Sequence, residues 1–206
     1  MPILAIATSK GGAGKTTLAA CLADYWVRMD QKVVCIDTDP NRNLDDWIKN
    51  SQICSTSIVV EEEGLLDAVE KSVDAVDWVI IDVAGSLARG LLYAVSAADV
   101  VLMPCRCDRK DVIEACRTQE IIQSAGKMMR RTIAHAAVLT QVNRRADVTS
   151  HTIQQLKIME IPVLSATVPI RTAYQKASYT GTPLSNTEIR KDIAAIVEEI
   201  NAIIRR

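Results

Sequence analysis

The sequence predicts a doubly wound α/β fold, in which helices cover both faces of one mostly parallel β-sheet. Short apolar runs alternate along the chain with longer segments of helical periodicity, a pattern typical of consecutive β–α–β units whose strands are buried on both sides. Right-handed crossovers between such strands place the connecting helices on both faces. The predicted strands are Ile3–Ala7, Val33–Ile36, Val79–Ile81, Val100–Met103 and Ile133–Leu139.

Turn-forming residues separate these elements. Beyond them we expect a last helix that starts near Ser185 or Asn186, because its isoleucines recur with a period of 3.6 residues and would pack on the sheet. With 206 residues, 49% of them apolar, the chain can bury a full core, and we expect a single domain over residues 1–206. The predicted breaks are Asp30-Gln31, Asp39-Pro40-Asn41, Ala84-Gly85-Ser86, Met103-Pro104, Ile161-Pro162 and Thr180-Gly181-Thr182-Pro183.

Composition excludes several classes of protein. A formal net charge of −1 argues against a wholly basic nucleic-acid binder, although it leaves room for a local basic patch. Six cysteines lie mostly in apolar patterns, which favours free thiols in a reducing cytoplasm. The one-residue spacing of Cys105 and Cys107 is too tight for a usual zinc site. The chain begins with a strand rather than a signal sequence, and no run of about eighteen apolar residues predicts a spanning helix.

The first strand leads directly into a glycine-rich turn, after which a helix is expected to start at Lys15. Backbone N–H groups and the positive end of that helix would surround one anionic group, and glycines let the backbone approach its oxygens. We expect Lys15 to reach the β- and γ-phosphates of a nucleotide, Thr16 to ligate Mg²⁺ and Thr17 to bond the α-phosphate. Ser9 stands where the usual P-loop pattern has its first glycine. The turn reads Ser9-Lys10-Gly11-Gly12-Ala13-Gly14-Lys15-Thr16-Thr17.

A second lysine, Lys10, precedes the glycines, and the pattern K-G-G-x-G-K-T-T resembles the deviant Walker A motif of the ParA/MinD family of ATPases. The resemblance extends over nearly the whole chain and implies a P-loop fold that binds ATP with Mg²⁺. It also implies that Lys10 crosses to the phosphates of a partner subunit and closes an ATP-dependent homodimer, as an arginine finger supplies charge across an interface. The implied phosphate-binding residues are Lys10, Gly11, Gly12, Ala13, Gly14, Lys15, Thr16 and Thr17, with Lys10 and Lys15 also catalytic.

Carboxylates follow the ends of two further strands. The segment from Asp37 to Asn41 resembles the family's D-x-D-P-Q motif, with asparagine in place of glutamine. The resemblance implies that Asp39 orients the attacking water and that Asp37 supports Mg²⁺ through its water shell, as suits a metaphosphate-like transition state. Asp82 takes the place of the Walker B carboxylate and is the expected Mg²⁺ anchor. Gly85 would leave the following switch loop free to move when the γ-phosphate departs.

Two segments are expected near the adenine base. One strand ends at Leu139-Thr140-Gln141-Val142-Asn143, and the Asn143 carboxamide matches the donor–acceptor edge of adenine. A turn or helix-cap role for Asn143 is an equally good interpretation. The later segment from Val168 to Ala177 resembles the family's loop beside the base, so the backbones of Pro169 and Ile170 are expected to contact adenine. Common versions of that loop have arginine directly after the proline, whereas Ile170 intervenes here.

Members of the family use ATP to dimerise and then bind either nonspecific DNA or the membrane, and the sequence favours DNA. The tail from Val197 to Arg206 is short, partly acidic and free of aromatic residues, which argues against a helix on the membrane surface. The chain resembles the small ParA type, which hydrolyses ATP slowly and partitions plasmids, chromosomes or other cargo with a ParB-like partner. We expect it on the nucleoid, in the cytoplasm.

Two alternatives stay open. One is a MinD-like, membrane-associated positioning ATPase, and the other is a metal-cluster carrier that would use Cys105 and Cys107 at a dimer interface. For the DNA-binding interpretation, the candidate phosphate contacts are Arg144, Arg145, Lys176, Arg190, Lys191, Arg205 and Arg206, with Lys127, Arg130 and Arg131 as a separate cluster.

Overall fold

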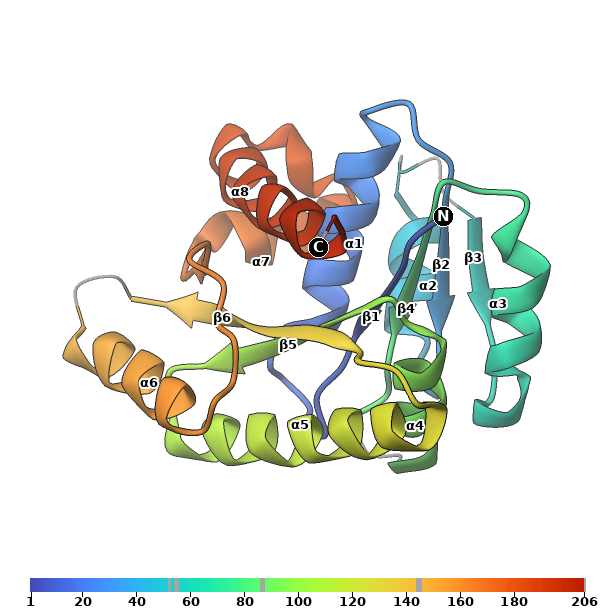
Figure 1. Ribbon diagram of the computed structural model, residues 1–206. Helices are drawn as coiled ribbons and strands as arrows, with labels where there is room; N and C mark the ends of the chain where they lie inside the picture. The colour runs from blue at the N-terminus through green and yellow to red at the C-terminus, as the bar shows by residue number, and fades with distance from the viewer. Residues whose placement is uncertain (52, 54–55, 86–87, 144–145, 206) are drawn as a thin grey trace.

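Seven strands in the described part of the chain form one parallel sheet, in the order β3-β2-β4-β1-β5-β6-β7 (Figure 1). The computed structural model describes residues 1–51, 53, 56–85, 88–143 and 146–205. Strand β1 lies at the centre, as expected for a doubly wound sheet. The strands are β1 (Ile3–Ile6), β2 (Val33–Asp37), β3 (Thr56–Val59), β4 (Trp78–Asp82), β5 (Val100–Arg106), β6 (Ala134–Val142) and β7 (Val168–Pro169).

Helices cover both faces of this sheet (Figure 1). Helices α1, α2, α7 and α8 contribute to one apolar core, and α3, α4, α5 and α6 contribute to the other. The helices are α1 (Lys15–Val27), α2 (Asn43–Lys49), α3 (Leu65–Val73), α4 (Ala88–Ala97), α5 (Arg109–Met129), α6 (Asp147–Ile158), α7 (Thr172–Thr180) and α8 (Thr187–Ile204), with 3-10 turns η1 (Glu62–Gly64) and η2 (Pro183–Ser185).

The apolar strands feed both cores because neighbouring residues of a strand point to opposite faces. In β1, Leu4 and Ile6 belong to the core beneath α1 and α8, whereas Ala5 belongs to the core beneath α4 and α5. All three are fully buried. The predicted doubly wound α/β class is therefore confirmed.

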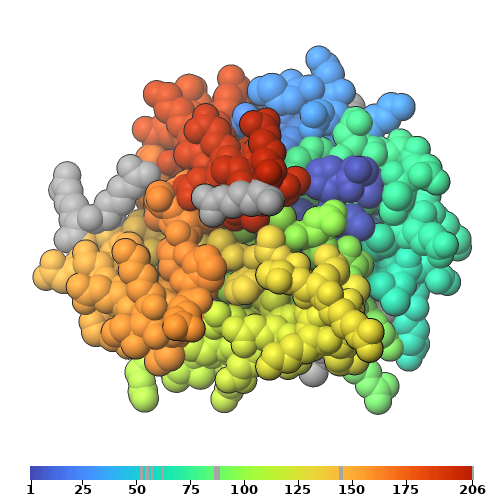
Figure 2. Space-filling model, viewed as in Figure 1, coloured from blue at the N-terminus to red at the C-terminus, as the bar shows by residue number. Residues whose placement is uncertain are grey.

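Helix α8 starts where the sequence predicts. The Asn186 side chain accepts hydrogen bonds from the backbone N–H groups of Glu188 at 2.9 Å and Ile189 at 3.2 Å, which caps the helix. Ile193 and Ile196 are fully buried in the first core. Figure 2 shows side chains of α8 in red, between the N-terminal segment in blue and the α6 segment in orange. The apolar face of α8 is therefore buried in the protein's own core.

Three details of the strand prediction are wrong. Strands β3 and β7 were not predicted, because each is short and lies at an edge of the sheet, where an apolar run is not required. Pro104 was predicted to break β5, yet the strand continues to Arg106. The Leu102 carbonyl accepts the Ala7 N–H, so the backbone groups of Leu102 point toward β1. The backbone groups of Pro104, two positions on, point to the same side, where β1 has already ended. The N–H that proline lacks is not needed there.

Candidate functional site

The glycine-rich loop between β1 and α1 has the backbone geometry of a phosphate cradle. Gly12 and Gly14 have φ angles of 81° and 91°, in the left-handed region that glycine adopts without steric cost. Thr140 Oγ1 donates to the Ala13 carbonyl at 2.8 Å, and Gln141 Nε2 donates to the Gly12 carbonyl at 3.2 Å. Carbonyls that are bonded outside the loop leave its interior to N–H groups, as phosphate binding requires. As predicted, α1 starts at Lys15.

Thr16 and Asp82 meet at the bottom of the loop, where they fit a magnesium ion. The Thr16 hydroxyl donates to Asp82 Oδ2 at 2.7 Å. The other carboxylate oxygen, Oδ1, is buried and has no hydrogen-bond partner among the described residues. Burial, together with the nearby Asp37 charge, raises the pKa of Asp82 to about 7, although the Thr16 hydroxyl and Lys15 oppose this. A hydroxyl and an unused carboxylate oxygen are the hard donors that Mg²⁺ prefers.

The ammonium of Lys15 lies over the loop, where it donates to the Lys10 carbonyl at 2.9 Å. Burial lowers the pKa of Lys15, and the charges of Asp82 and Asp39 work against this. Gly85, after β4, packs directly on the loop. A Cβ atom added to it would lie 2.9 Å from the Lys10 carbonyl carbon and 3.0 Å from Lys15 Nζ. The structure thus gives a close approach as the reason for glycine at position 85, in addition to the predicted freedom of the switch loop.

Asp37 supports the turn that carries Asp39. It is fully buried, and its Oδ1 accepts the Asp39 N–H at 2.9 Å, while Oδ2 accepts the N–H groups of Leu44 and Asp45 at 2.9 and 3.1 Å. Asp37 therefore caps the start of α2, a role that the sequence did not predict. Asp39 Oδ1 is held in turn by Asn41, whose backbone and side-chain nitrogens both donate to it. The predicted support of Mg²⁺ by Asp37 through water stays a prediction.

Lys10 forms an ion pair within its own chain. Its Nζ lies 2.6 Å from Asp111 Oδ1, near the start of α5. Arg106, at the end of β5, holds the same carboxylate through Nε at 2.9 Å and Nη2 at 3.0 Å. These two partners lie about 100 positions away in the chain, and the sequence analysis missed both. Arg106 ends β5 and Asp111 lies in the first turn of α5. That position is the signal that could have found them, since ligands bind at the carboxyl edge of an open sheet.

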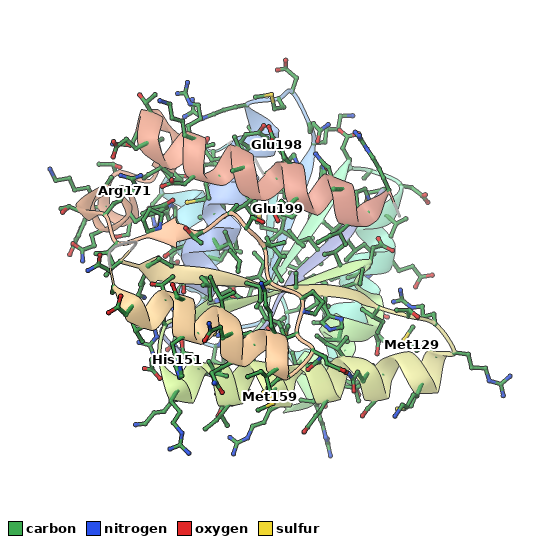
Figure 3. All side chains as sticks on the ribbon, turned by 60° about the vertical axis from the view of Figure 1, so that its left-hand side comes forward. Met129, His151, Met159, Arg171, Glu198 and Glu199 are labelled. Atoms are coloured by element: carbon green, nitrogen blue, oxygen red, sulfur yellow. The ribbon has the colours of Figure 1, made fainter. Side chains whose placement is uncertain are left out.

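A cavity of about 410 Å³ opens beside Gly14 and Thr17, where a nucleoside attached to the cradled phosphates would lie. The predicted base neighbours Pro169 and Ile170 line it, as does Arg171, which Figure 3 labels near the start of α8. Arg171 is held there by Asp192, with Nε and Oδ2 2.9 Å apart. The cavity lining also includes Leu18, Cys21, Thr140, Gln141, Val168, Tyr174, Gln175, Ser178 and Ile193.

Asn143 is not among the residues that line this cavity. Its backbone carbonyl accepts the Ala146 N–H at 3.0 Å and the Thr149 hydroxyl at 3.2 Å, at the start of α6. These backbone contacts place Asn143 in the turn before α6, and contact of its carboxamide with adenine stays a prediction. Thr140 and Gln141, three and two positions earlier, line the cavity.

Residues 4–184 match the family model described as the CobQ/CobB/MinD/ParA nucleotide binding domain. The chain belongs to this family. It is 30% identical over 209 residues to Protein ParA of Rhizobium radiobacter, with 98% of this chain and 94% of the relative covered. It is 28% identical over 206 residues to Maintenance of carboxysome distribution protein A of Halothiobacillus neapolitanus, with the same coverage of 98% and 94%. The predicted ParA/MinD family is thus confirmed, and the chain is a ParA/MinD-family ATPase.

Solved structures share the fold of this ParA/MinD-family chain. The apo form of McdA from Cyanothece has a TM-score of 0.80 at 19% identity, with 97% of this chain and 99% of that one covered. The ATP complex of an McdA variant has a TM-score of 0.76 at 20% identity, with 98% and 96% covered. Both likenesses confirm the P-loop fold.

The structure separates the candidate DNA contacts of this ParA/MinD-family ATPase into two groups. Arg131 donates to the Ser96 and Ala98 carbonyls, and Arg190 donates to the Leu184 carbonyl, so both guanidinium groups hold the protein's own backbone. Arg144, Arg145 and Arg206 lie outside the described residues. The described candidates that are exposed to solvent are Lys127, Arg130, Lys176, Lys191 and Arg205, together with Arg190 despite its hydrogen bond to Leu184.

Proposed function

We propose that this chain binds ATP with Mg²⁺, dimerises around the nucleotide, and binds nonspecific DNA in the dimeric state. Slow ATP hydrolysis, stimulated by a ParB-like partner, then releases it, so that repeated cycles on the nucleoid position a plasmid, a chromosome or other cargo in the cytoplasm. The observation that carries the proposal is a lysine, Lys10, placed directly in front of a cradle in which Lys15, Thr16 and Asp82 already converge.

The residues of the site divide the work of phosphoryl transfer. Lys15 neutralises charge on the β- and γ-phosphates, and the loop N–H groups orient them. Thr16 and Asp82 would hold Mg²⁺, which would supply positive charge at the phosphates. Asp39 orients the attacking water, and the hydrogen bonds from Asn41 fix its carboxylate for that task. Lys10 of one subunit stabilises the transition-state charge in the other.

The names of the relatives support a positioning role. The similarity to Protein ParA and to Maintenance of carboxysome distribution protein A covers 98% of this chain in each case. Both names belong to proteins of nearly the same length as this chain, since 94% of each relative is covered. Distribution of a large cargo by a small ATPase is therefore the function class we carry over, and the cargo itself stays open.

Two exposed lysines, Lys176 and Lys191, are the candidates that we propose for contact with DNA phosphates. Lys176 on α7 and Lys191 on α8 are exposed. Arg190 is exposed as well, but it donates to the Leu184 carbonyl, so substituting it would also disturb the start of α8. A dimer doubles any weak phosphate-binding patch, so binding becomes strong only in the ATP-bound state. Substituting Lys176 and Lys191 together by alanine is expected to lower DNA affinity and flatten its salt dependence, with Lys71→Ala on α3 as the matched control.

The membrane alternative has less support. Ile189, Ile193, Ile196 and Ile200 of α8 are fully buried in the first core, so this helix has no free apolar face to insert into a bilayer. Within the described ranges, no helix has the length and apolar character needed to cross a membrane.

The metal-cluster carrier has less support as well. Cys105 is buried, with 1% exposure, and burial raises the pKa of its thiol to about 12. The Cys107 thiol faces the Thr149 hydroxyl. A carrier would need two accessible thiolates at an interface.

The decisive experiment measures binding to nonspecific duplex DNA with ATP, with ADP and without nucleotide, at two salt concentrations. Vesicles of anionic phospholipid are tested in parallel. We expect salt-sensitive DNA binding that requires ATP and is lost in Lys15→Ala. ATP-dependent binding to vesicles alone would replace the proposal by the membrane alternative, and binding to neither would favour the carrier.

A further inference from the structure

Helix α5 holds the front of the phosphate loop through two acidic side chains on neighbouring turns. Asp111 accepts the Lys10 ammonium at 2.6 Å, and Glu114 accepts the Ser9 hydroxyl. The Asp111 side chain is 2% exposed and the Lys10 side chain is 27% exposed. The lysine expected to reach into a partner subunit is thus engaged by a buried carboxylate of its own chain.

Asp111 does not depend on Lys10 alone. Arg106 donates to it from Nε at 2.9 Å, from Nη2 at 3.0 Å and from the backbone nitrogen at 3.0 Å. Burial by itself would raise the pKa of Asp111, but the hydrogen bonds from Arg106 and Lys10 outweigh it and lower the pKa to about 2. When Lys10 leaves, the three hydrogen bonds from Arg106 remain. The carboxylate therefore avoids the costly state of a buried, unpaired charge.

Lys15 is tied to the same place. Its ammonium donates to the carbonyl of Lys10, so the position of residue 10 affects both lysines of the loop. In the described conformation the Lys10 ammonium bonds Asp111 on α5, and the Lys10 carbonyl accepts a hydrogen bond from the Lys15 ammonium. A change of partner at Lys10 is accordingly a change in the whole front of the loop.

We propose that the Lys10–Asp111 ion pair is a latch that restrains dimerisation of the monomer, and that Arg106 sets how easily the latch opens. The proposal rests on the proposed function, in which Lys10 contacts nucleotide phosphates across the dimer. On opening, phosphate oxygens replace Asp111 as partners of the Lys10 ammonium, and Arg106 retains Asp111. Both Lys10 and Asp111 keep a partner of opposite charge in the open and the closed latch, so the exchange is reversible. Asp111 and Arg106 act here as positioning residues.

The latch itself is tested without nucleotide or dimer. The rate at which an amine-acylating reagent modifies Lys10 is measured by mass spectrometry in the wild type and in Asp111→Asn, with exposed Lys71 as the internal reference. Loss of a charge-assisted hydrogen bond to a buried acceptor is expected to raise the Lys10 rate roughly ten-fold while Lys71 is unchanged. An unchanged Lys10 rate overturns the latch.

The effect on assembly is tested by two substitutions with opposite expected signs. Asp111→Asn weakens the hold on Lys10 and is expected to lower the ATP concentration for half-maximal dimer, measured by light scattering. Arg106→Gln leaves Asp111 more dependent on Lys10 and is expected to raise that concentration. The exposed Asp67→Asn on α3 serves as the matched control. A purely structural role of the network predicts a shift in the same direction for both variants, and that result overturns the proposal.

Two further results separate the latch from the proposed function. If Lys10→Ala dimerises with ATP as the wild type does, the cross-subunit role fails, and the latch as a control of assembly fails with it. If Lys10→Ala loses the dimer while Asp111→Asn and Arg106→Gln assemble at the wild-type ATP concentration, only the latch fails. Should Asp111→Asn not fold, Arg106→Gln decides alone, and an unchanged or lower half-maximal ATP concentration overturns the latch.

Discussion

Gly85→Ala tests the packing of the β4 strand end on the phosphate loop. The added Cβ would lie 2.9 Å from the Lys10 carbonyl carbon, 3.0 Å from Lys15 Nζ and 3.1 Å from the Gly11 nitrogen. The Lys15 ammonium can swing aside, but the other two atoms belong to the backbone of the loop. The loop must therefore move by several tenths of an ångström, and overpacking of this kind costs about 1–3 kcal/mol.

This cost is expected to lower the melting temperature and to weaken ATP binding. For a chain of this size it corresponds to a fall in the melting temperature of roughly 2–12 °C without nucleotide. Displacement of the loop and of Lys15 also weakens phosphate binding. If the bound loop bears the same cost, the Kd for ATP is expected to rise about five-fold to about a hundred-fold, since each 1.4 kcal/mol is a factor of ten.

The assays are thermal unfolding and titration with a fluorescent ATP analogue, and Gly64→Ala is the matched control. A Cβ at Gly64 would lie 3.7 Å from the Val60 Cβ, an ordinary contact, so that variant is expected to be as stable as the wild type or up to about 1 kcal/mol more stable. If Gly85→Ala melts and binds ATP as Gly64→Ala does, the argument from close approach is wrong.

Further predictions concern four residues of the site. Lys15→Ala is expected to abolish ATP binding, whereas Asp39→Ala is expected to bind ATP, dimerise and stall; normal ATP turnover in the Asp39 variant would reject its role in orienting water. Thr140→Val removes the hydroxyl that holds the Ala13 carbonyl at 2.8 Å, and the unsatisfied carbonyl is expected to raise the Kd for ADP about ten-fold by calorimetry; an unchanged Kd would show that the loop keeps its shape without this contact. The pKa of Asp82 is raised to about 7, above its ordinary value near 4, so the folded protein binds this proton more tightly than the unfolded chain does. The free energy of unfolding is therefore highest below pH 4 and falls as the pH rises through 7, by about 4 kcal/mol at most. In urea titrations with EDTA from pH 5 to 8, Asp82→Asn is expected to remove this decline, and an identical decline in both proteins would contradict the assignment.

The sequence by itself determined the features that depend on neighbouring residues. The alternation of apolar strands with helices predicts the doubly wound sheet, and five of the described strands were located from their apolar runs. The glycine-rich loop was located from the sequence, because Gly12, Gly14 and the helix start at Lys15 lie within one continuous turn. Its binding of phosphate stays a prediction. The helix-start signal at Asn186 is likewise local, since its side chain bonds N–H groups two and three residues ahead.

Only the tertiary structure decided which distant residues meet at that loop. Strands β1 and β5 are neighbours in the sheet, so the end of β5 brings Arg106 and Asp111 to Lys10. Strand β6 likewise brings Thr140 and Gln141 to the wall of the cavity beside Gly14 and Thr17. Strand order and the point at which each strand ends depend on packing across the whole sheet, and no short stretch of one sequence encodes them.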